Sequence, residues 1–344
     1  MLRAMPNKAP KPPVIGDVAR RAGVSVPTVS RVINGAAYVS DDKRARVMQA
    51  IDELGFRPSA AARALVARQP KLIAVVAGNT SRYGYAETIR GIEESARSAG
   101  YTVSITVVES ADEETVERAV SLILDQPIAG VIVLKFDPPG VAALHRIPKS
   151  IPTVSISGVR ETGVPQAVLA EAAAAEEVVE HLLGLGHRTV HHVRVPPSRK
   201  EDGRTTGWRR ALAARQADVP APFDASWDPE SGRQIGHRLA ADPDVTAIFC
   251  GNDEIAMGVI RGLVEEGKQV PADVSVVGFD DHPLARMWSP PLTTVDQDFA
   301  GLGSRAYELL EGVIGGGRVK KFSSERPVFV VRESTAPPPV PPAR

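Results

Sequence analysis

The 344-residue chain is poor in cysteine and has no long apolar run, and both shortages restrict what it can be. Its single cysteine, Cys250, excludes an internal disulfide and any metal site built on several cysteines. No apolar run approaches the ~18–20 residues that a membrane span needs. The first residues, MLRAMPNKAPKPPV, lack the apolar segment of a secretion signal, so we expect a cytoplasmic protein without membrane contact.

The net charge of zero conceals an uneven distribution of charge along the chain. Residues 1–70 hold 12 Lys and Arg against 5 Asp and Glu, so this part carries about +7 and the remainder about −7. A basic head on an acidic body indicates that the head meets a polyanion. The alternative is a solvated basic segment with no partner.

Apolar residues at helical spacing predict three short helices after a Pro-rich arm over residues 1–13, which we expect to be disordered. The first helix ends at Gly23, the second covers residues 26–33, and the third follows the N-cap candidate Ser40 and ends at Gly55. The first two helices have the spacing of a helix-turn-helix. The second helix of such a motif places its N-terminal side chains in the major groove of DNA.

Exposed side chains of the second helix are candidates for DNA contacts. Arg31 is the strongest candidate for a base contact, because a guanidinium can form two hydrogen bonds with guanine. Val26 and Pro27 can contact a thymine methyl but cannot donate a hydrogen bond from the side chain. Side chains suited to phosphate contacts are Thr28, Ser30, Asn34 and Tyr38. The alternative is a helical pair that binds protein or only packs.

From residue 72 onward, short apolar runs alternate with helical patterns. Strands are predicted at 72–77, 101–108, 128–134, 152–157, 189–195, 246–250 and 274–279. Helices are predicted between them at 86–99, 112–125, 171–185, 203–216, 231–240 and 253–267. This alternation predicts parallel sheets covered on both faces, arranged as two sheets or as one closed barrel. The Pro-rich end is expected to be disordered.

Polar side chains that follow predicted strands are candidates for a ligand site, because ligands of open α/β sheets bind beyond the carboxyl ends of the strands. These side chains are Asn79, Ser157, Asn252, Asp253 and Asp280, with Arg204 at the start of a helix. Such a mixture of amides, carboxylates and an arginine suits a molecule with many hydroxyls. The indole of Trp227 suits the apolar face of a sugar ring.

The motif DVARRAGVSVPTVSRVING, followed by YVS, LGFRPSAAARAL and a long α/β region, resembles the LacI/GalR family of bacterial transcriptional regulators. Later motifs fit in the same order: GHR (186–188), RTTGW (204–208), GNDEIAMG (251–258), DVSVVGFDD (273–281) and PPLTTVDQDF (290–299). The resemblance covers residue 14 to about residue 335. It implies a ligand-responsive repressor that binds near-palindromic, double-stranded operator DNA as a homodimer.

The resemblance also implies the domain organisation. An N-terminal all-α helix-turn-helix domain covers 14–58, a hinge helix 59–70, and an α/β core of the type I periplasmic-binding-protein-like fold 71–335. Two parallel-sheet subdomains form this core, about 71–160 with 291–322 and 161–290 with 323–335. We expect the C-terminal residues 336–344 to form a disordered tail.

In the family the hinge segment forms a helix on the operator and enters the minor groove. A leucine that wedges into the central base step falls on Leu65 here, with Ala62 beside it. The family often has Asn where this chain has Ser59.

The family's effector pocket maps onto many of the residues found above. Sugar-contacting residues fall on Arg204, Asn252 and Asp280, a ligand-stacking tryptophan on Trp227, and a pocket phenylalanine on Phe299. Ser157 replaces an aspartate that contacts sugar hydroxyls, and the first ligand loop carries Asn79 with Tyr83 nearby. The resemblance therefore implies a sugar-like effector bound between the subdomains, without specifying which sugar it is.

Several candidates have structural alternatives that the sequence leaves open. Asp280 could cap a turn, and Asn252 could cap a helix. Arg204 could form a surface salt bridge, Trp227 could pack in the core, and Tyr83 could be an exposed loop residue.

No pattern of catalytic or metal-binding residues stands out. His191 and His192 point to opposite faces of a predicted strand, GHR with His187 is a structural motif, and Cys250 ends an apolar strand. There is no GxSxG elbow and no phosphate-binding lysine loop. We expect no enzyme, no metal and no cofactor. The alternatives are a cytoplasmic sugar-binding protein and a sugar-active α/β enzyme. The chain end lacks a leucine heptad, so we expect a dimer rather than a tetramer.

Overall fold

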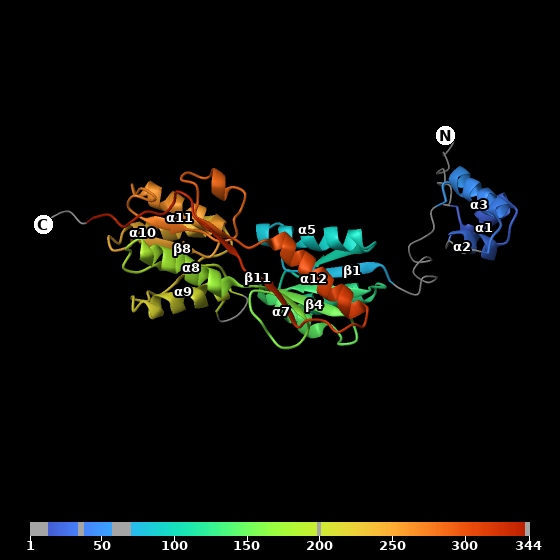
Figure 1. The fold of residues 1–344 in the computed structure, drawn as a ribbon, viewed down its shortest axis with the longest axis horizontal. Coiled ribbons are helices and arrows are strands. Elements are labelled where there is room, and N and C mark those ends of the chain that lie inside the picture. The colour runs from blue at the N-terminus through green and yellow to red at the C-terminus, as the bar shows by residue number, and fades with distance from the viewer. Residues whose placement is uncertain (1–12, 34–37, 57–69, 198–200, 341–344) are drawn as a thin grey trace, which may run out of the picture. The chain divides into compact units, whose positions relative to one another are not determined.

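The computed structural model describes residues 13–33, 38–56, 70–197 and 201–340. The chain divides into two compact units, residues 1–70 and 71–344 (Figure 1). Some predicted features lie outside the described residues. These are the arm up to residue 12, Asn34, and the hinge segment up to residue 69 with Ala62 and Leu65.

The first unit contains the three predicted helices, α1 (Ile15–Ala22), α2 (Val26–Ile33) and α3 (Asp41–Leu54). Gly23 and Gly55 end α1 and α3 with φ values of +63° and +61°, a conformation that glycine adopts at little cost. Ser40 occupies the N-cap position of α3, but its side chain makes no capping hydrogen bond. The small apolar core of this unit consists of Val18, Ala19, Ala22, Val29, Val32, Val47, Ala50 and Phe56.

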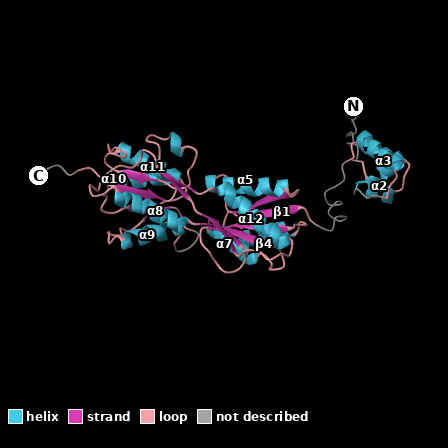
Figure 2. Ribbon diagram, in the orientation of Figure 1, coloured by secondary structure: helices cyan, strands magenta, loops and turns pink. Residues whose placement is uncertain are grey.

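The first subdomain of the second unit is built on a six-stranded parallel sheet in the order β11-β5-β4-β3-β1-β2. Its strands are β1 (Leu72–Ala77), β2 (Thr102–Val107), β3 (Gly130–Leu134), β4 (Thr153–Ser157), β5 (Gln166–Leu169) and β11 (Phe322–Glu325). Successive residues of β1 pack on opposite faces of the sheet. One face is covered by α5 (Tyr83–Ser98) and α12 (Phe299–Ile314), the other by α6 (Glu113–Leu124) and α7 (Pro138–Arg146) (Figure 2).

The second subdomain contains a four-stranded parallel sheet in the order β7-β6-β8-β9. Its strands are β6 (His191–Arg194), β7 (Phe223–Asp224), β8 (Ala247–Cys250) and β9 (Ser275–Val277). On one face lie α10 (Pro229–Ala240) and α11 (Asp253–Glu265), and on the other α8 (Glu171–Gly184) and α9 (Gly203–Ala214). The antiparallel pair β10 (Thr294–Asp296) and β12 (Val328–Val330) adjoins this sheet, and a short 3-10 helix covers Ala285–Met287.

The two open sheets confirm the expected α/β core and exclude the closed barrel. The structure corrects the expected subdomain boundaries. Strand β5 pairs with β4 and β11, so the chain stays in the first subdomain through Leu169 and not only to residue 160. Val295 of β10 packs in the core of the second subdomain. The chain therefore returns to the first subdomain after β10 and not at residue 291. Strand β11 extends to Glu325, beyond the expected crossing at 322.

Part of the expected disordered tail is attached to the second subdomain. The backbone N–H of Ala336 donates to Ser275 Oγ at 3.0 Å, and the Ala336 carbonyl lies 3.0 Å from His187 Nε2. Because these bonds fix the backbone, the expectation of disorder over 336–344 is wrong for Ala336. Among the described residues, no helix is both long and apolar enough to span a bilayer.

Candidate functional site

The outer face of α2 presents the side chains predicted to contact DNA. Val29 and Val32 face the core and are buried, whereas Val26, Pro27 and Arg31 are exposed. Three further candidates also lie on this unit: Thr28 and Ser30 are half-buried, and Tyr38, beyond α2, is 97% exposed. Helical periodicity thus separates a packing face from an accessible face, as the sequence predicted.

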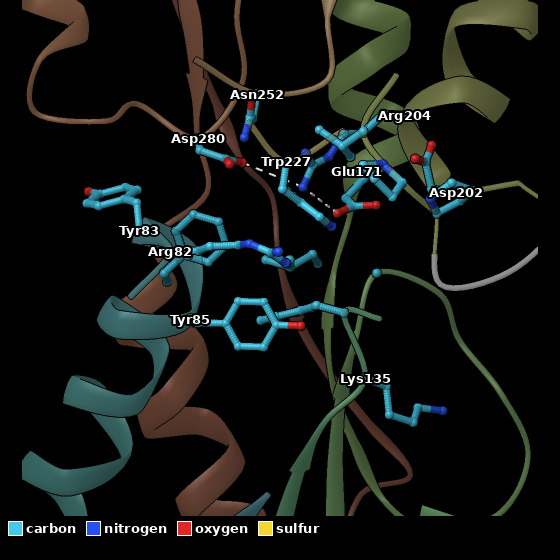
Figure 3. A pocket seen from close by; sticks show the side chains of 18 of the residues that line it. Arg82, Tyr83, Tyr85, Lys135, Glu171, Asp202, Arg204, Trp227, Asn252 and Asp280 are labelled. Carbon is cyan, nitrogen blue, oxygen red and sulfur yellow. Dashed lines mark hydrogen bonds and ion pairs between the residues drawn. The ribbon is translucent and has the colours of Figure 1, made fainter. Parts of the chain in front are cut away.

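The second unit contains a cleft between its two subdomains, at the carboxyl ends of the strands (Figure 3). It holds about 770 Å³ of empty space, part of it continuous with solvent. Side chains from both subdomains line it. Six of the eight predicted effector residues are among them: Tyr83, Arg204, Trp227, Asn252, Asp280 and Phe299.

Asn79 and Ser157 do not border the cleft. Asn79 Oδ1 accepts hydrogen bonds from the backbone N–H groups of Ser81 and Arg82, at 2.8 and 2.9 Å, and so shapes the turn before α5. Ser157 is buried at the end of β4, where its Oγ accepts from the N–H of Val159 at 3.2 Å. Both side chains stabilise loops, which explains why a position after a strand is not sufficient to define a lining residue.

Asp253, a further candidate from its place after a strand, is also structural. Its carboxylate accepts from Thr294 Oγ1 at 2.5 Å and from the N–H of His282 at 2.6 Å, and only 1% of the residue is exposed.

Arg204 is the centre of a buried charge cluster and not a surface salt bridge. Its Nη2 donates to Glu171 Oε1 at 3.0 Å and lies 3.6 Å from Asp280 Oδ1, while Nη1 donates to the carbonyl of Gly251. The guanidinium carbon also lies 4.7 Å from the centre of the Phe279 ring. Burial alone would lower the pKa of Arg204, but the nearby carboxylates outweigh it and raise the pKa, so the side chain stays cationic.

Two carboxylates share this one cation. Burial raises the pKa of Asp280 to about 6, against the lowering effects of Arg204 and of the hydrogen bond from Gln297. Burial likewise raises the pKa of Glu171, and Arg204 opposes it. When both acids are ionised, the cluster carries one negative charge in excess. Such a cluster can accept hydrogen bonds from ligand hydroxyls.

For Asn252 and Trp227 the structural and ligand-lining roles coincide. Asn252 caps α11, where its Oδ1 accepts from the N–H of Ile255 at 2.9 Å, and it also borders the cleft. Trp227 packs against the second core and exposes part of its ring to the cleft.

Tyr83 is the first residue of α5 rather than a loop residue. Its ring lies edge-on to Phe299 with a centroid distance of 6.0 Å. Burial and nearby carboxylates raise the pKa of Tyr83 to about 12, so the phenol is neutral.

Several lining residues were not predicted from the sequence: Arg82, Tyr85, Lys135, Glu171, Asp202 and Glu254. Arg82, Glu171, Asp202 and Glu254 lie at the N-termini of helices that follow strands. Attention to the first turn of each such helix, in addition to strand ends, would have found them. The pairing of Glu171 with Arg204 joins two helices and has no local signal.

His192, one of the histidines considered above, has structural hydrogen-bond partners. His192 is buried, with Nδ1 3.0 Å from the Phe249 carbonyl and Nε2 3.1 Å from Thr205 Oγ1. Burial lowers the pKa of His192 to about 4, so it packs as a neutral side chain. In the part of the chain that the structure describes, no group of three or more His, Cys, Asp or Glu residues is arranged to hold a metal ion.

Comparison with known proteins identifies relatives over nearly the whole chain. Residues 14–59 match the bacterial regulatory proteins of the lacI family, and residues 179–335 match the periplasmic binding protein-like domain. The lactose operon repressor of Escherichia coli (strain K12) is 31% identical over 328 residues, which cover 94% of this chain and 91% of that protein. The transcriptional repressor PurR of Pectobacterium carotovorum is 33% identical and covers 94% and 96%, respectively.

Solved structures agree with this assignment. The lac repressor dimer bound to operator and the anti-inducer ONPF has a TM-score of 0.88 at 31% identity, covering 95% of this chain and all of that chain. The complex of the transcriptional regulator CelR with cellobiose has a TM-score of 0.69 at 27% identity, covering 94% and 99%. With its helix-turn-helix head, its two-sheet core and this similarity along its length, the chain belongs to the lacI family of bacterial regulatory proteins.

Proposed function

We propose that this protein is a transcriptional repressor that binds a palindromic operator as a homodimer and is controlled by a small sugar-like effector in the cleft. The observation that carries the proposal is the combination, in one chain of this family, of an exposed α2 face and a polar cleft. Relatives support it: the lac repressor was solved as a dimer on operator DNA, and CelR in complex with cellobiose. Since its target in this proposal is operator DNA, we propose that the protein acts in the cytoplasm.

In this proposal α2 lies in the major groove. Arg31 contacts a base edge, Val26 and Pro27 contact apolar base surface, and Thr28 and Ser30 contact phosphates. Tyr38 and Asn34 add phosphate contacts, and the segment with Ala62 and Leu65 enters the minor groove. Because the first unit is small and basic, two copies on one duplex gain both affinity and a two-fold-symmetric site.

In the cleft, the Glu171–Arg204–Asp280 cluster holds hydroxyls of the effector, and Trp227 stacks on its ring. Glu171 and Arg204 come from the second subdomain, whereas Tyr83 and Phe299 come from the first. A ligand that contacts both walls changes the relative stability of open and closed arrangements of the subdomains. It regulates DNA binding only to the extent that it binds the two arrangements with different affinity.

The proposal is tested by selecting duplexes from a random pool with the full-length chain and then adding sugars. We expect the selected sites to be inverted repeats, and one or more sugars to change their mobility-shift midpoint. Selection of no inverted repeat, with or without sugars, would contradict the proposal. We propose no catalytic activity, since the relatives above are repressors, and turnover of a sugar by the pure chain would contradict that part.

Arg31→Ala is expected to cost about 1–3 kcal/mol of binding at one base-pair position of each half-site, because a bidentate base contact is lost. The measurement is a mobility-shift series on the selected site and on single-base variants. Arg46→Ala is the matched control, since Arg46 is exposed on α3 and lies 3.3 Å from Asp42. An equal loss on matched and scrambled duplexes after Arg31→Ala would show that Arg31 contacts only the backbone.

The chain is expected to form a dimer in solution, because the lac repressor, which it resembles over 95% of its length, was solved as a dimer on operator DNA. Light scattering of the full-length protein at micromolar concentration measures this directly. A stable tetramer would refute the prediction, and a monomer that stays monomeric on operator DNA would refute the homodimer itself.

A further inference from the structure

The two walls of the cleft differ in charge. Among the residues that the structure describes, four carboxylates line the cleft, and all come from the second subdomain: Glu171, Asp202, Glu254 and Asp280. The first subdomain contributes aromatic rings and two cations, Arg82 and Lys135. Figure 3 shows this division, with Arg82, Tyr83, Tyr85 and Lys135 opposite Asn252, Asp280, Glu171 and Arg204. A ligand that spans the cleft therefore meets acids on one side and cations on the other.

Arg82 is set apart from the other cations in the cleft by its contacts. Arg204 is paired with Glu171 and Asp280, and Lys135 Nζ with Glu161. Among the residues that the structure describes, no carboxylate lies within ion-pair distance of Arg82. Its guanidinium carbon instead lies 4.3 Å from the centre of the Trp227 ring, a contact that joins the two subdomains. In Figure 3 the side chain extends across the cleft.

A sugar that stacks on the cleft face of Trp227 must displace Arg82 from that ring. The displaced guanidinium then needs another partner inside the cleft, because an unpaired charge shielded from water is costly. The first turn of α5, which Arg82 precedes as the N-cap residue, contains no acidic residue that could pair with it. A neutral sugar would offer this guanidinium only uncharged hydroxyl oxygens as acceptors, which form weaker hydrogen bonds than a charged group does. A ligand carboxylate or phosphate would replace the cation–π contact with a charge-assisted, bidentate pair.

We infer that the effector is an anionic sugar, one that carries a carboxylate or a phosphate, and that Arg82 is the residue that selects it. The hydroxyls of this ligand face the Glu171–Arg204–Asp280 cluster, and its anionic group faces the first subdomain. This orientation keeps the anion away from the acidic wall, which would repel it. The inference rests on the proposed role of the cleft as a sugar-effector site.

The experiment is calorimetric titration of the full-length chain with matched neutral and anionic sugars. Galacturonate, glucuronate and gluconate test the carboxylate, glucose 6-phosphate and galactose 6-phosphate test the phosphate, and glucose and galactose are the neutral partners. We expect at least one anionic sugar to bind about 10- to 100-fold more tightly than its neutral partner, as a hydrogen-bonded charge pair implies. Whether that sugar carries a carboxylate or a phosphate identifies which anionic group the cleft binds.

Arg82→Gln tests the residue. It should reduce the affinity for the anionic sugar to that for the neutral partner, leaving the neutral sugar as well bound as before or better. Arg82→Lys should restore part of the preference, since charge returns without the planar fork. Arg90→Gln is the matched control, because Arg90 lies on the same helix outside the cleft and pairs with Glu87 and Glu94.

The outcomes separate this inference from the proposed function. If neutral sugars bind as tightly as every anionic one and still shift operator binding, the sensor role stands and the anion inference is wrong. If Arg82→Gln weakens neutral and anionic sugars equally, Arg82 only packs, and the inference is again wrong. If no sugar of either kind binds, both the anion inference and the sugar-sensor role fail.

Discussion

Replacing Arg204 with alanine is expected to lower the free energy of unfolding of the second unit at pH 7, and to abolish the effector response. Removal of the guanidinium leaves Glu171 and Asp280 buried without their cation. Breaking a buried pair from one side costs about 3–5 kcal/mol, and we expect the lower end because the cleft admits water. Chemical denaturation followed by fluorescence of Trp208, which is fully buried on the same helix, measures the loss.

The deficit caused by Arg204→Ala should shrink on acidification. Both carboxyls already have raised pKa values, and without Arg204 these rise further, so the folded variant binds more protons than the unfolded chain. Stability contributed by such groups is present at low pH and is lost as pH rises through the folded pKa. We therefore expect a smaller difference from wild type at pH 5 than at pH 8.

Arg210→Ala is the control for Arg204→Ala, because Arg210 lies on the same helix and is largely exposed. Its ion pair with Glu176 is long, with 3.8 Å between Nη1 and Oε1. It should change stability by less than about 1 kcal/mol. If Arg204→Ala were as stable as this control at pH 8, the cluster would not hold two ionised acids around one cation. Retention of the wild-type effector response would remove Arg204 from the proposed site.

Asp280→Asn is expected to have the opposite effect on stability while also abolishing the effector response. In the wild-type structure Gln297 Nε2 donates to Asp280 Oδ1 at 2.7 Å, and asparagine keeps an oxygen that can accept this hydrogen bond. Arg204 stays paired with Glu171. It removes a carboxylate whose ionisation is opposed by burial, which raises its pKa from 3.8 to about 6. Asparagine also tolerates the positive φ of this position, +108°.

The sign of the pH dependence follows from the raised pKa of Asp280. The carboxyl favours the folded state while it is protonated, below about 3.8, and this contribution is lost as pH rises through about 6. Asp280→Asn does not undergo this loss, so above pH 6 it should be more stable than wild type by up to about 3 kcal/mol. Denaturation midpoints at pH 4, 6 and 8 measure the difference.

Effector affinity should fall at least about 10-fold in Asp280→Asn, since a charged acceptor of ligand hydroxyls is lost. Operator binding without effector should stay at the wild-type level, because α2 lies in the other unit. A destabilised variant at pH 8 would show that Asp280 is needed for the fold. A stable variant with normal effector release would show that Asp280 does not contact the ligand.

Local patterns in the sequence were sufficient to predict most regular elements. The three helices of the head have apolar residues at helical spacing and glycines at their ends, and these signals depend only on neighbouring residues. Strands β1 and β3 are apolar runs that are buried on both faces, and such runs are visible without knowing their partners. The motifs that this chain shares with the family predicted, in addition, the order of the two units and the residues expected in the cleft.

Elements stabilised mainly by distant contacts were missed. The helix α12 contains three glycines that weaken a helical pattern, and it forms against α5, where a Cβ on Gly91 would lie 2.0 Å from the Ala300 carbonyl. Strand β5 has four residues and lies between β4 and β11, the latter more than 150 positions later in the chain. Nothing in either short stretch indicates its partner.

The sequence alone determined the kinds of side chain available: a basic head, an acidic body, and amides, acids and arginines near strand ends. Only the tertiary structure decided which of them meet. It placed Glu171 beside Arg204, turned Asn79 and Ser157 to structural roles, and brought Arg82 onto Trp227 across the cleft. The physical reason is that charge, burial and hydrogen bonding depend on distances through space, and the packing of two separate sheets sets those distances.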